Sequence, residues 1–212
     1  MRIPSLSFPL LAGAIACSAL TLSSCGNGQD RSAATSEASA EVPEQAAKAT
    51  AALDRVQASL TRLQGAEGAE ALRKGHQELA GNADRLGAAL AATAASSEAA
   101  VASGREQIAK WHQEADTFTE VSLREASSRR EGQLREAVDA LAACNANLAT
   151  SGGAYRAKLG QTINALDLDL SQQGIAGVGP VIAKLNADQS ALRGHLSDVT
   201  AGSRAVRAVI SP

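Results

Sequence analysis

The chain contains few aromatic residues and few cysteines. Only 2% of its 212 residues are aromatic, whereas 45% are hydrophobic, carried largely by alanine with leucine and valine. Strands favour aromatic and β-branched side chains, and alanine and leucine favour helices, so the composition predicts an all-α protein. The 20 basic and 22 acidic residues are interspersed. No basic surface for a nucleic-acid partner is therefore expected.

The first 25 residues are organised like a bacterial lipoprotein signal. Arg2 supplies a positive charge, Phe8 to Leu22 is an apolar run, and Leu22-Ser23-Ser24-Cys25 resembles a lipobox. The run is shorter than the roughly 20 residues that span a bilayer as a helix. We therefore expect residues 1–24 to be removed as a signal peptide and Cys25 to be lipidated. The alternative is an ordinary secretory signal that leaves Cys25 as a free thiol.

An acylated Cys25 would make membrane lipid the first partner of the chain. Gly26 follows it, instead of the aspartate that retains enteric lipoproteins in the inner membrane. The resemblance to lipoproteins thus implies attachment to the periplasmic face of the outer membrane. Cys17 leaves with the signal peptide, so Cys144 remains without an intrachain partner. It is either buried in a core or available for pairing between chains.

Two further regions follow the signal peptide. Residues 25–42 are rich in Gly, Ser, Ala and Glu and have no large apolar residue before Val42, which predicts a lipidated N-terminus with a disordered tether. Residues 43–212 carry apolar residues at alternating spacings of three and four. This pattern predicts an elongated, coiled-coil-like, antiparallel up-down bundle of four helices. The helices are expected from Pro43, from about Ala69 to Ala115, from about Ser122 to Leu170, and from Pro180.

The helix lengths leave two arrangements open. Either the hairpin of the two long middle helices projects beyond the others, or the first and fourth helices pack along one side at opposite ends. Asn145 falls in the apolar seam of the third helix, where a polar residue fixes register at some cost in stability. Gly152 and Gly153 predict either a kink or the close approach of a neighbouring helix. Residues 173–179 are expected to form a loop.

No pattern in the sequence indicates catalysis, a cofactor or a metal. His76, His112 and His195 have no partner four residues away that would place two ligands on one helical face. Asp167 and Asp169 would face different sides of a helix. The sequence therefore predicts a protein that is not an enzyme.

The turn between the two long helices is the part of the sequence richest in residue types that are rare elsewhere in the chain. Its aromatic, apolar and basic residues form a possible interaction tip: Trp111, Phe118, Leu123, Arg124, Arg129 and Arg130. One interpretation is that the apolar residues cap the end of the bundle while the charges form helical salt links. The other is a recognition site for a partner protein, an anionic headgroup or an envelope polymer.

The same region carries a family resemblance. Ser122-Leu123-Arg124, Ser128 and Gln133-Leu134-Arg135-Glu136, preceded by Trp111, resemble the bacterial envelope proteins called domain of unknown function twenty-nine fifty-nine. The similarity extends over most of residues 43–210. It implies a helical lipoprotein or secreted protein and transfers no catalytic residue.

Two functions are compatible with these features. The first is a non-enzymatic interaction or scaffold module of the cell envelope, whose partner is an envelope protein or polymer. The second is a lipid-handling protein whose amphipathic helices open to cover apolar ligands. Covalent attachment to the cell wall is disfavoured because the chain ends in Ser211-Pro212 and lacks the terminal lysine that such lipoproteins use.

Overall fold

The computed structural model describes residues 28–211, which form four helices and no strand. These are α1 (Gly28–Gln64), α2 (Ala69–Ala115), α3 (Val121–Leu168) and α4 (Gln172–Ile210). The all-α helical bundle predicted from composition and periodicity is confirmed. Among these helices, none combines the length and the apolar character that a membrane span requires.

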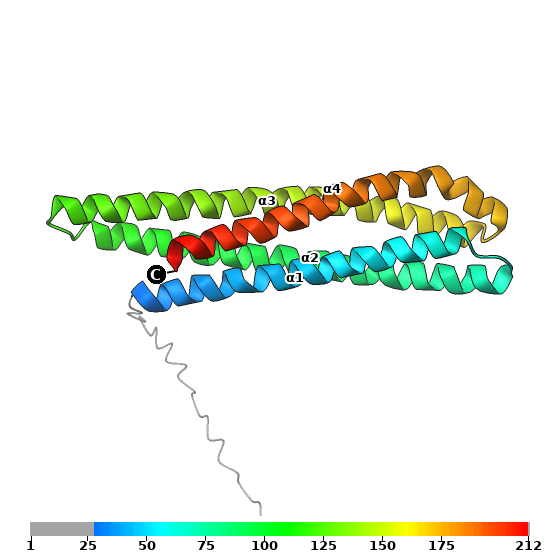
Figure 1. The fold of residues 1–212 in the computed structure, drawn as a ribbon, viewed down its shortest axis with the longest axis horizontal. Helices are drawn as coiled ribbons and strands as arrows, with labels where there is room; N and C mark the ends of the chain where they lie inside the picture. The colour runs from blue at the N-terminus through cyan, green and yellow to red at the C-terminus, as the bar shows by residue number, and fades with distance from the viewer. Residues whose placement is uncertain (1–27, 212) are drawn as a thin grey trace, which may run out of the picture.

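The helices run up and down in a ring. Each packs against the next along the chain, and α1 also packs against α4 (Figure 1). At 1.5 Å per residue, the 47 residues of α2 give the bundle a length of about 70 Å. The α2–α3 hairpin projects beyond the start of α1 and the end of α4 (Figure 1). Of the two expected arrangements, the structure shows the projecting hairpin.

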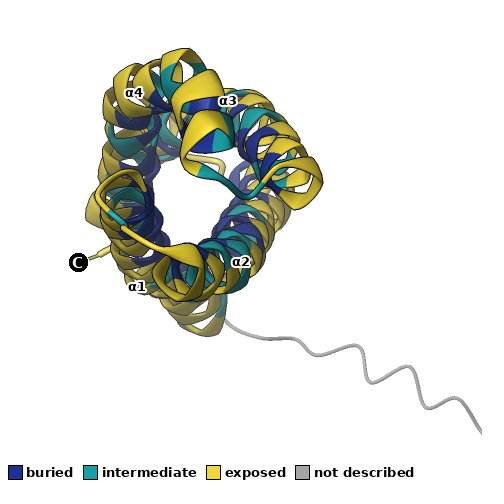
Figure 2. Ribbon diagram, turned by 90° about the vertical axis from the view of Figure 1, so that its right-hand side faces the viewer, coloured by how far each residue is buried: buried dark blue, intermediate teal, exposed yellow. Residues whose placement is uncertain are grey.

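The core follows the predicted apolar seams. Buried residues face the axis of the bundle along all four helices (Figure 2). The leucines spaced seven apart in α2 and α3 are all buried: Leu72, Leu79, Leu86, Leu134, Leu141 and Leu148. Leucine at regular seam positions fills the interior and excludes water from it, and this burial is the main source of stability in such a bundle.

Two exceptions to the leucine pattern lie in the seam of α3. Asn145 is only 8% exposed, and its Oδ1 has no hydrogen-bond partner among the described residues. Gly152 lies where an added Cβ would be 3.3 Å from Cδ1 of Leu90 and 3.9 Å from Cδ1 of Leu192. Helix α3 continues through this position, so Gly152 allows the close approach of neighbouring side chains.

The expectation of a disordered tether is wrong for residues 28–42. Helix α1 begins at Gly28, well before Pro43, and residues 25–27 lie outside the described part of the chain. Thr35, Ser39 and Val42 are buried at spacings of four and three, which continues the seam of α1 toward its start. The seam was missed because its first positions carry hydroxyl groups instead of large apolar side chains.

The hydroxyl groups at the start of α1 contact polar side chains of α2. Gln107 Nε2 donates a hydrogen bond to Ser32 Oγ at 2.8 Å, and the hydroxyls of Thr35 and Ser103 lie 2.9 Å apart. These hydrogen bonds compensate Ser32 and Thr35 for lost contacts with water, whereas the buried Ser39 hydroxyl has no hydrogen-bond partner among the described residues. At this end of α1, hydrogen bonds between polar side chains therefore help to hold α1 against α2, as buried leucines do elsewhere in the bundle.

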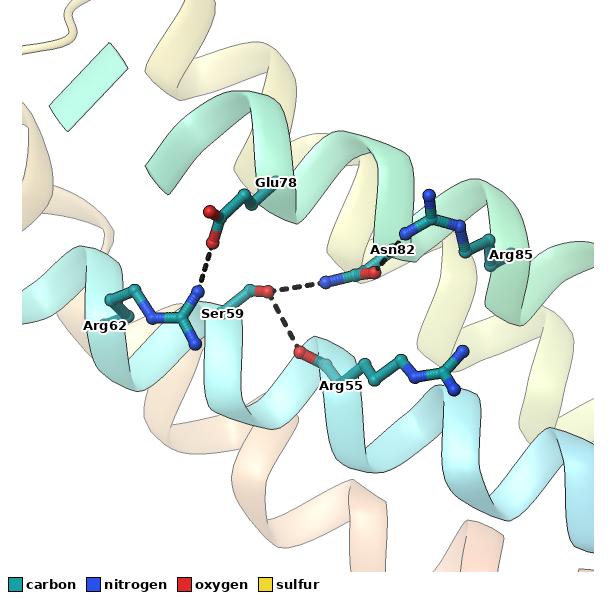
Figure 3. Close-up of polar contacts among 6 residues, drawn as sticks. All are labelled: Arg55, Ser59, Arg62, Glu78, Asn82 and Arg85. Carbon is teal, nitrogen blue, oxygen red and sulfur yellow. Dashed lines mark hydrogen bonds and ion pairs between the residues drawn. The ribbon is translucent and has the colours of Figure 1, made fainter. Parts of the chain in front are cut away.

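Polar side chains also bridge α1 and α2 in the other half of the rod (Figure 3). Asn82 Nδ2 donates to Ser59 Oγ at 2.8 Å, and Ser59 Oγ donates to the carbonyl of Arg55 at 2.9 Å. Arg62 and Glu78 form an ion pair beside them. The α1–α2 pair is thus fixed in register at both ends, since each polar bridge joins two specific positions.

The expected loop over residues 173–179 and the start of the fourth helix at Pro180 are also wrong. Helix α4 begins at Gln172, and the side chain of Ser171 caps it by accepting a hydrogen bond from the Gly174 amide at 3.1 Å. Ile175 and Val178 are buried and extend the seam of α4 toward its start. The glycines and Pro180 suggested a loop, but a cap and two apolar anchors outweigh their poor helix propensity.

Candidate functional site

The candidate site lies at the end of the rod where α1 begins. The α2–α3 turn and the end of α4 are at the same end (Figure 1). Cys25, the expected lipidation site, lies outside the described residues and is three positions before Gly28. The structure therefore brings the predicted interaction tip to the end of the bundle from which the chain leads back to Cys25.

Two members of the predicted tip are part of the bundle's framework. The Arg130 guanidinium lies 5.3 Å from the centre of the Trp111 ring, within the range of a cation–π interaction. Its Nε and Nη2 also donate to the carbonyl of Val209, at 3.3 Å and 3.2 Å. Trp111 is half-buried against the core. This contact joins α2, α3 and the last turn of α4, so Trp111 and Arg130 close the bundle end.

The other members of the tip are exposed. Phe118 is 37% exposed and Leu123 55%, and Arg129 is also exposed. Arg124 Nη2 donates to the carbonyl of Phe118 at 2.7 Å, which fixes the turn around the phenylalanine. Sequence reasoning missed Val121, the first residue of α3, which is 65% exposed. We call Phe118, Val121 and Leu123 together the apolar tip.

Charges around the apolar tip are balanced. Asp116 and Glu120 lie in or beside the turn, whereas Arg124, Glu125, Arg129 and Arg130 lie in the first turns of α3. All six are exposed, and they contribute three negative and three positive charges. The surface is therefore not the basic patch that recognition of an anionic polymer would require.

Glu131 forms a polar contact behind the tip that the sequence did not reveal. Its carboxylate is buried, accepts a hydrogen bond from Arg135 Nη2 at 2.6 Å, and lies 3.3 Å from His112 Nδ1. The four-residue spacing of Glu131 and Arg135 was the available signal. Since both carboxylate oxygens have partners, the arrangement is that of a structural link between α2 and α3.

The other histidines are paired singly with carboxylates. His76 Nε2 lies 3.3 Å from Asp167 Oδ1, and His195 Nδ1 lies 3.7 Å from Asp198 Oδ2. Residues 28–211 contain no group of three or more His, Cys, Asp or Glu side chains that could hold a metal ion. Asp169 caps the end of α3 through its amide, which donates to Ala165.

Cys144 was expected to be either buried in the core or available for pairing between chains, and its burial is intermediate between the two. It is partly buried, packs against the core and is a free thiol. Burial raises the pKa of the Cys144 thiol, and the negative charge of Asp198 raises it further. A raised pKa keeps the sulfur in its less reactive protonated form.

Comparison with known proteins gives no relative. No protein-family model, curated protein or solved structure matches this chain. The resemblance to the envelope family stays a prediction that depends on the residues quoted for it.

Proposed function

We propose that this chain is a lipid-anchored periplasmic protein that acts as a non-enzymatic scaffold or interaction module of the cell envelope. Acyl chains on Cys25 would hold it at the periplasmic face of the outer membrane. The observation that carries the proposal is the start of α1 at one end of a rod, three residues after Cys25. An anchor there would hold one end of the rod near the membrane and leave its length, about 70 Å, to span toward an envelope protein or polymer.

The lipid anchor is tested by Cys25→Ala. We expect the mature wild-type chain to carry an N-terminal cysteine with the mass of bound acyl chains, and the variant to lose both this mass and its place in the outer-membrane fraction. Three acyl chains suffice for stable attachment, whereas no other element of the described chain supplies a span. Mass spectrometry of the N-terminus and membrane fractionation measure the two effects.

Cys144→Ala is the matched control for the loss of a cysteine. It should leave acylation and fractionation unchanged, because Cys144 lies against the bundle core. An unacylated mature wild-type chain, or a Cys25→Ala chain that stays in the outer membrane, would contradict the anchor. Crosslinking in intact cells that captures no envelope protein or polymer would contradict the scaffold role.

Lipid handling is the second candidate, favoured by the composition of the start of α1. From residue 30 to residue 45, Val42 is the only large apolar side chain that α1 contributes to the core. A segment that buries little apolar surface opens at a low free-energy cost. We expect amide hydrogen exchange to be faster over residues 30–45 than over the leucine-rich residues 53–63, and phospholipid to accompany the purified protein. Equal protection of both segments in lipid-free protein would contradict this function.

A further inference from the structure

We propose that the apolar tip is a second membrane contact, which rests in the surface of the same bilayer that holds the acylated Cys25. This inference depends on the proposed lipid anchor and adds to it an orientation of the rod. Two observations carry it: the reach of the chain between Cys25 and α1, and the exposed apolar side chains at that end.

The reach of the anchor is short. Three peptide units join Cys25 to Gly28, and consecutive Cα atoms are about 3.8 Å apart, so the start of α1 lies within about 11 Å of the lipidated residue. A tether extending to residue 42 would have left the bundle free of the membrane surface. With α1 beginning at Gly28, the end of the bundle is held beside the headgroups.

The tip extends further toward the membrane than α1 does. Ser32 and Gln107 lie at the same level of the rod because they share a hydrogen bond of 2.8 Å. From that level α1 continues four residues to Gly28, about 6 Å, whereas α2 continues eight residues to Ala115, about 12 Å. The turn that bears Phe118 lies beyond this point (Figure 1). An upright rod would therefore bring the tip to the bilayer before the anchor is fully extended.

The chemistry of the tip suits the boundary between headgroups and acyl chains. Phe118, Val121 and Leu123 present apolar surface to solvent at the far end of the hairpin. Burial of such surface contributes roughly 25 cal/mol per Å². The six charges around it sum to zero, so the contact does not depend on anionic lipid. Apolar burial and a lipid anchor together give two attachment points, which fix the tilt of the rod.

A fluorescent label at the tip tests the contact. In the lipidated full chain with Cys144→Ser, an environment-sensitive dye is attached at Thr119→Cys, beside Phe118, or at Gln173→Cys, at the opposite end of the rod. Both positions are exposed. On phosphatidylcholine vesicles, we expect the emission at 119 to shift to shorter wavelength and to be quenched by doxyl-labelled lipid. The label at 173 should show neither effect.

Matched substitutions assign the effect to the apolar side chains. Adding Phe118→Ser and Leu123→Ser should abolish both the shift and the quenching at 119. Leu168→Ser removes an exposed leucine from the other end of α3 and should leave both unchanged. The effects should be equal on vesicles that contain phosphatidylglycerol, since the charges around the tip balance.

Failures of the anchor and of the tip are distinguishable. Mature protein that carries no acyl chain and does not float with the vesicles overturns the anchor, and the tip contact with it. Acylated protein that floats with a water-exposed label at 119 overturns the tip contact alone. A tip that stays in water on vesicles but crosslinks to an envelope protein in intact cells identifies a protein-binding surface, which also overturns the membrane contact.

Discussion

Gly174→Ala is expected to destabilise the bundle by about 3 kcal/mol, although alanine is the better helix former. A Cβ at this position would lie 2.0 Å from the backbone oxygen of Asp169 and 3.0 Å from its carbonyl carbon. A backbone group cannot move aside as the end of a flexible side chain can. The α3–α4 turn must rearrange, which disturbs both the Ser171 cap of α4 and the Asp169 amide that closes α3.

Gly177→Ala is the matched control, one turn further along the same helix. Gly177 is exposed, and a Cβ there meets no atom within 4 Å. The substitution should stabilise the protein by up to about 1 kcal/mol, because alanine has the higher helix propensity and restricts the unfolded chain. Urea unfolding followed by circular dichroism measures both variants. Shifts of the same sign in the two variants would contradict this description of the turn.

The helix boundaries show what the sequence can and cannot predict. The start and end of α2 at Ala69 and Ala115 were predicted, because glycine and acidic turns flank a long apolar repeat. The starts of α1 and α4 were missed because local composition was unfavourable to helix. In both, a few buried positions outweigh propensity: Val42 with hydroxyl pairs in α1, and Ile175 and Val178 in α4.

The candidate site was predicted in part. A rare tryptophan and an aromatic turn between two long helices indicated the bundle end, and the structure places Trp111, Phe118 and Leu123 there. The sequence could not separate Arg130, which lies over the Trp111 ring, from its neighbour Arg129, although both are exposed. That distinction depends on the position of the end of α4, whose Val209 carbonyl accepts from Arg130. Arg130 and Val209 are 79 positions apart in the sequence, so their contact depends on how the four helices assemble.

The sequence also could not predict the distance between the tip and Cys25. Composition alone predicted a tether, which would separate the two by a long and variable span. The early start of α1 reverses this expectation, since most of that segment is helix that packs against the bundle through Thr35, Ser39 and Val42. The start of α1 at Gly28 therefore decides how far the bundle end can lie from Cys25.

Tyr155 is expected to make the protein sensitive to alkali. Its side chain is 1% exposed, and its hydroxyl has no hydrogen-bond partner among the described residues. Burial, and to a lesser extent the charge of Asp188, raises the pKa of Tyr155 to about 12. In the unfolded chain a tyrosine has a pKa of about 10. The folded state therefore keeps a proton that the unfolded state loses over this range.

The direction of the effect follows from proton binding. Below about pH 10 both states are protonated, so the contribution of Tyr155 is constant; between about pH 10 and 12 the unfolded state binds fewer protons, and stability falls as pH rises. Two units of pKa correspond to about 3 kcal/mol. Tyr155→Phe should lack this component and, at neutral pH, should be at least as stable as the wild type, because it removes a buried hydroxyl without a partner.

Urea unfolding at a series of pH values measures the difference between wild type and Tyr155→Phe. Other groups that titrate in alkali contribute to both proteins and cancel in the comparison. The variant should gain on the wild type by about 3 kcal/mol between pH 10 and 12. If the two free energies of unfolding decline in parallel, the Tyr155 hydroxyl ionises as readily in the folded state as in the unfolded chain. Water would then reach the centre of the bundle, as the opening of helices in a lipid-handling protein requires.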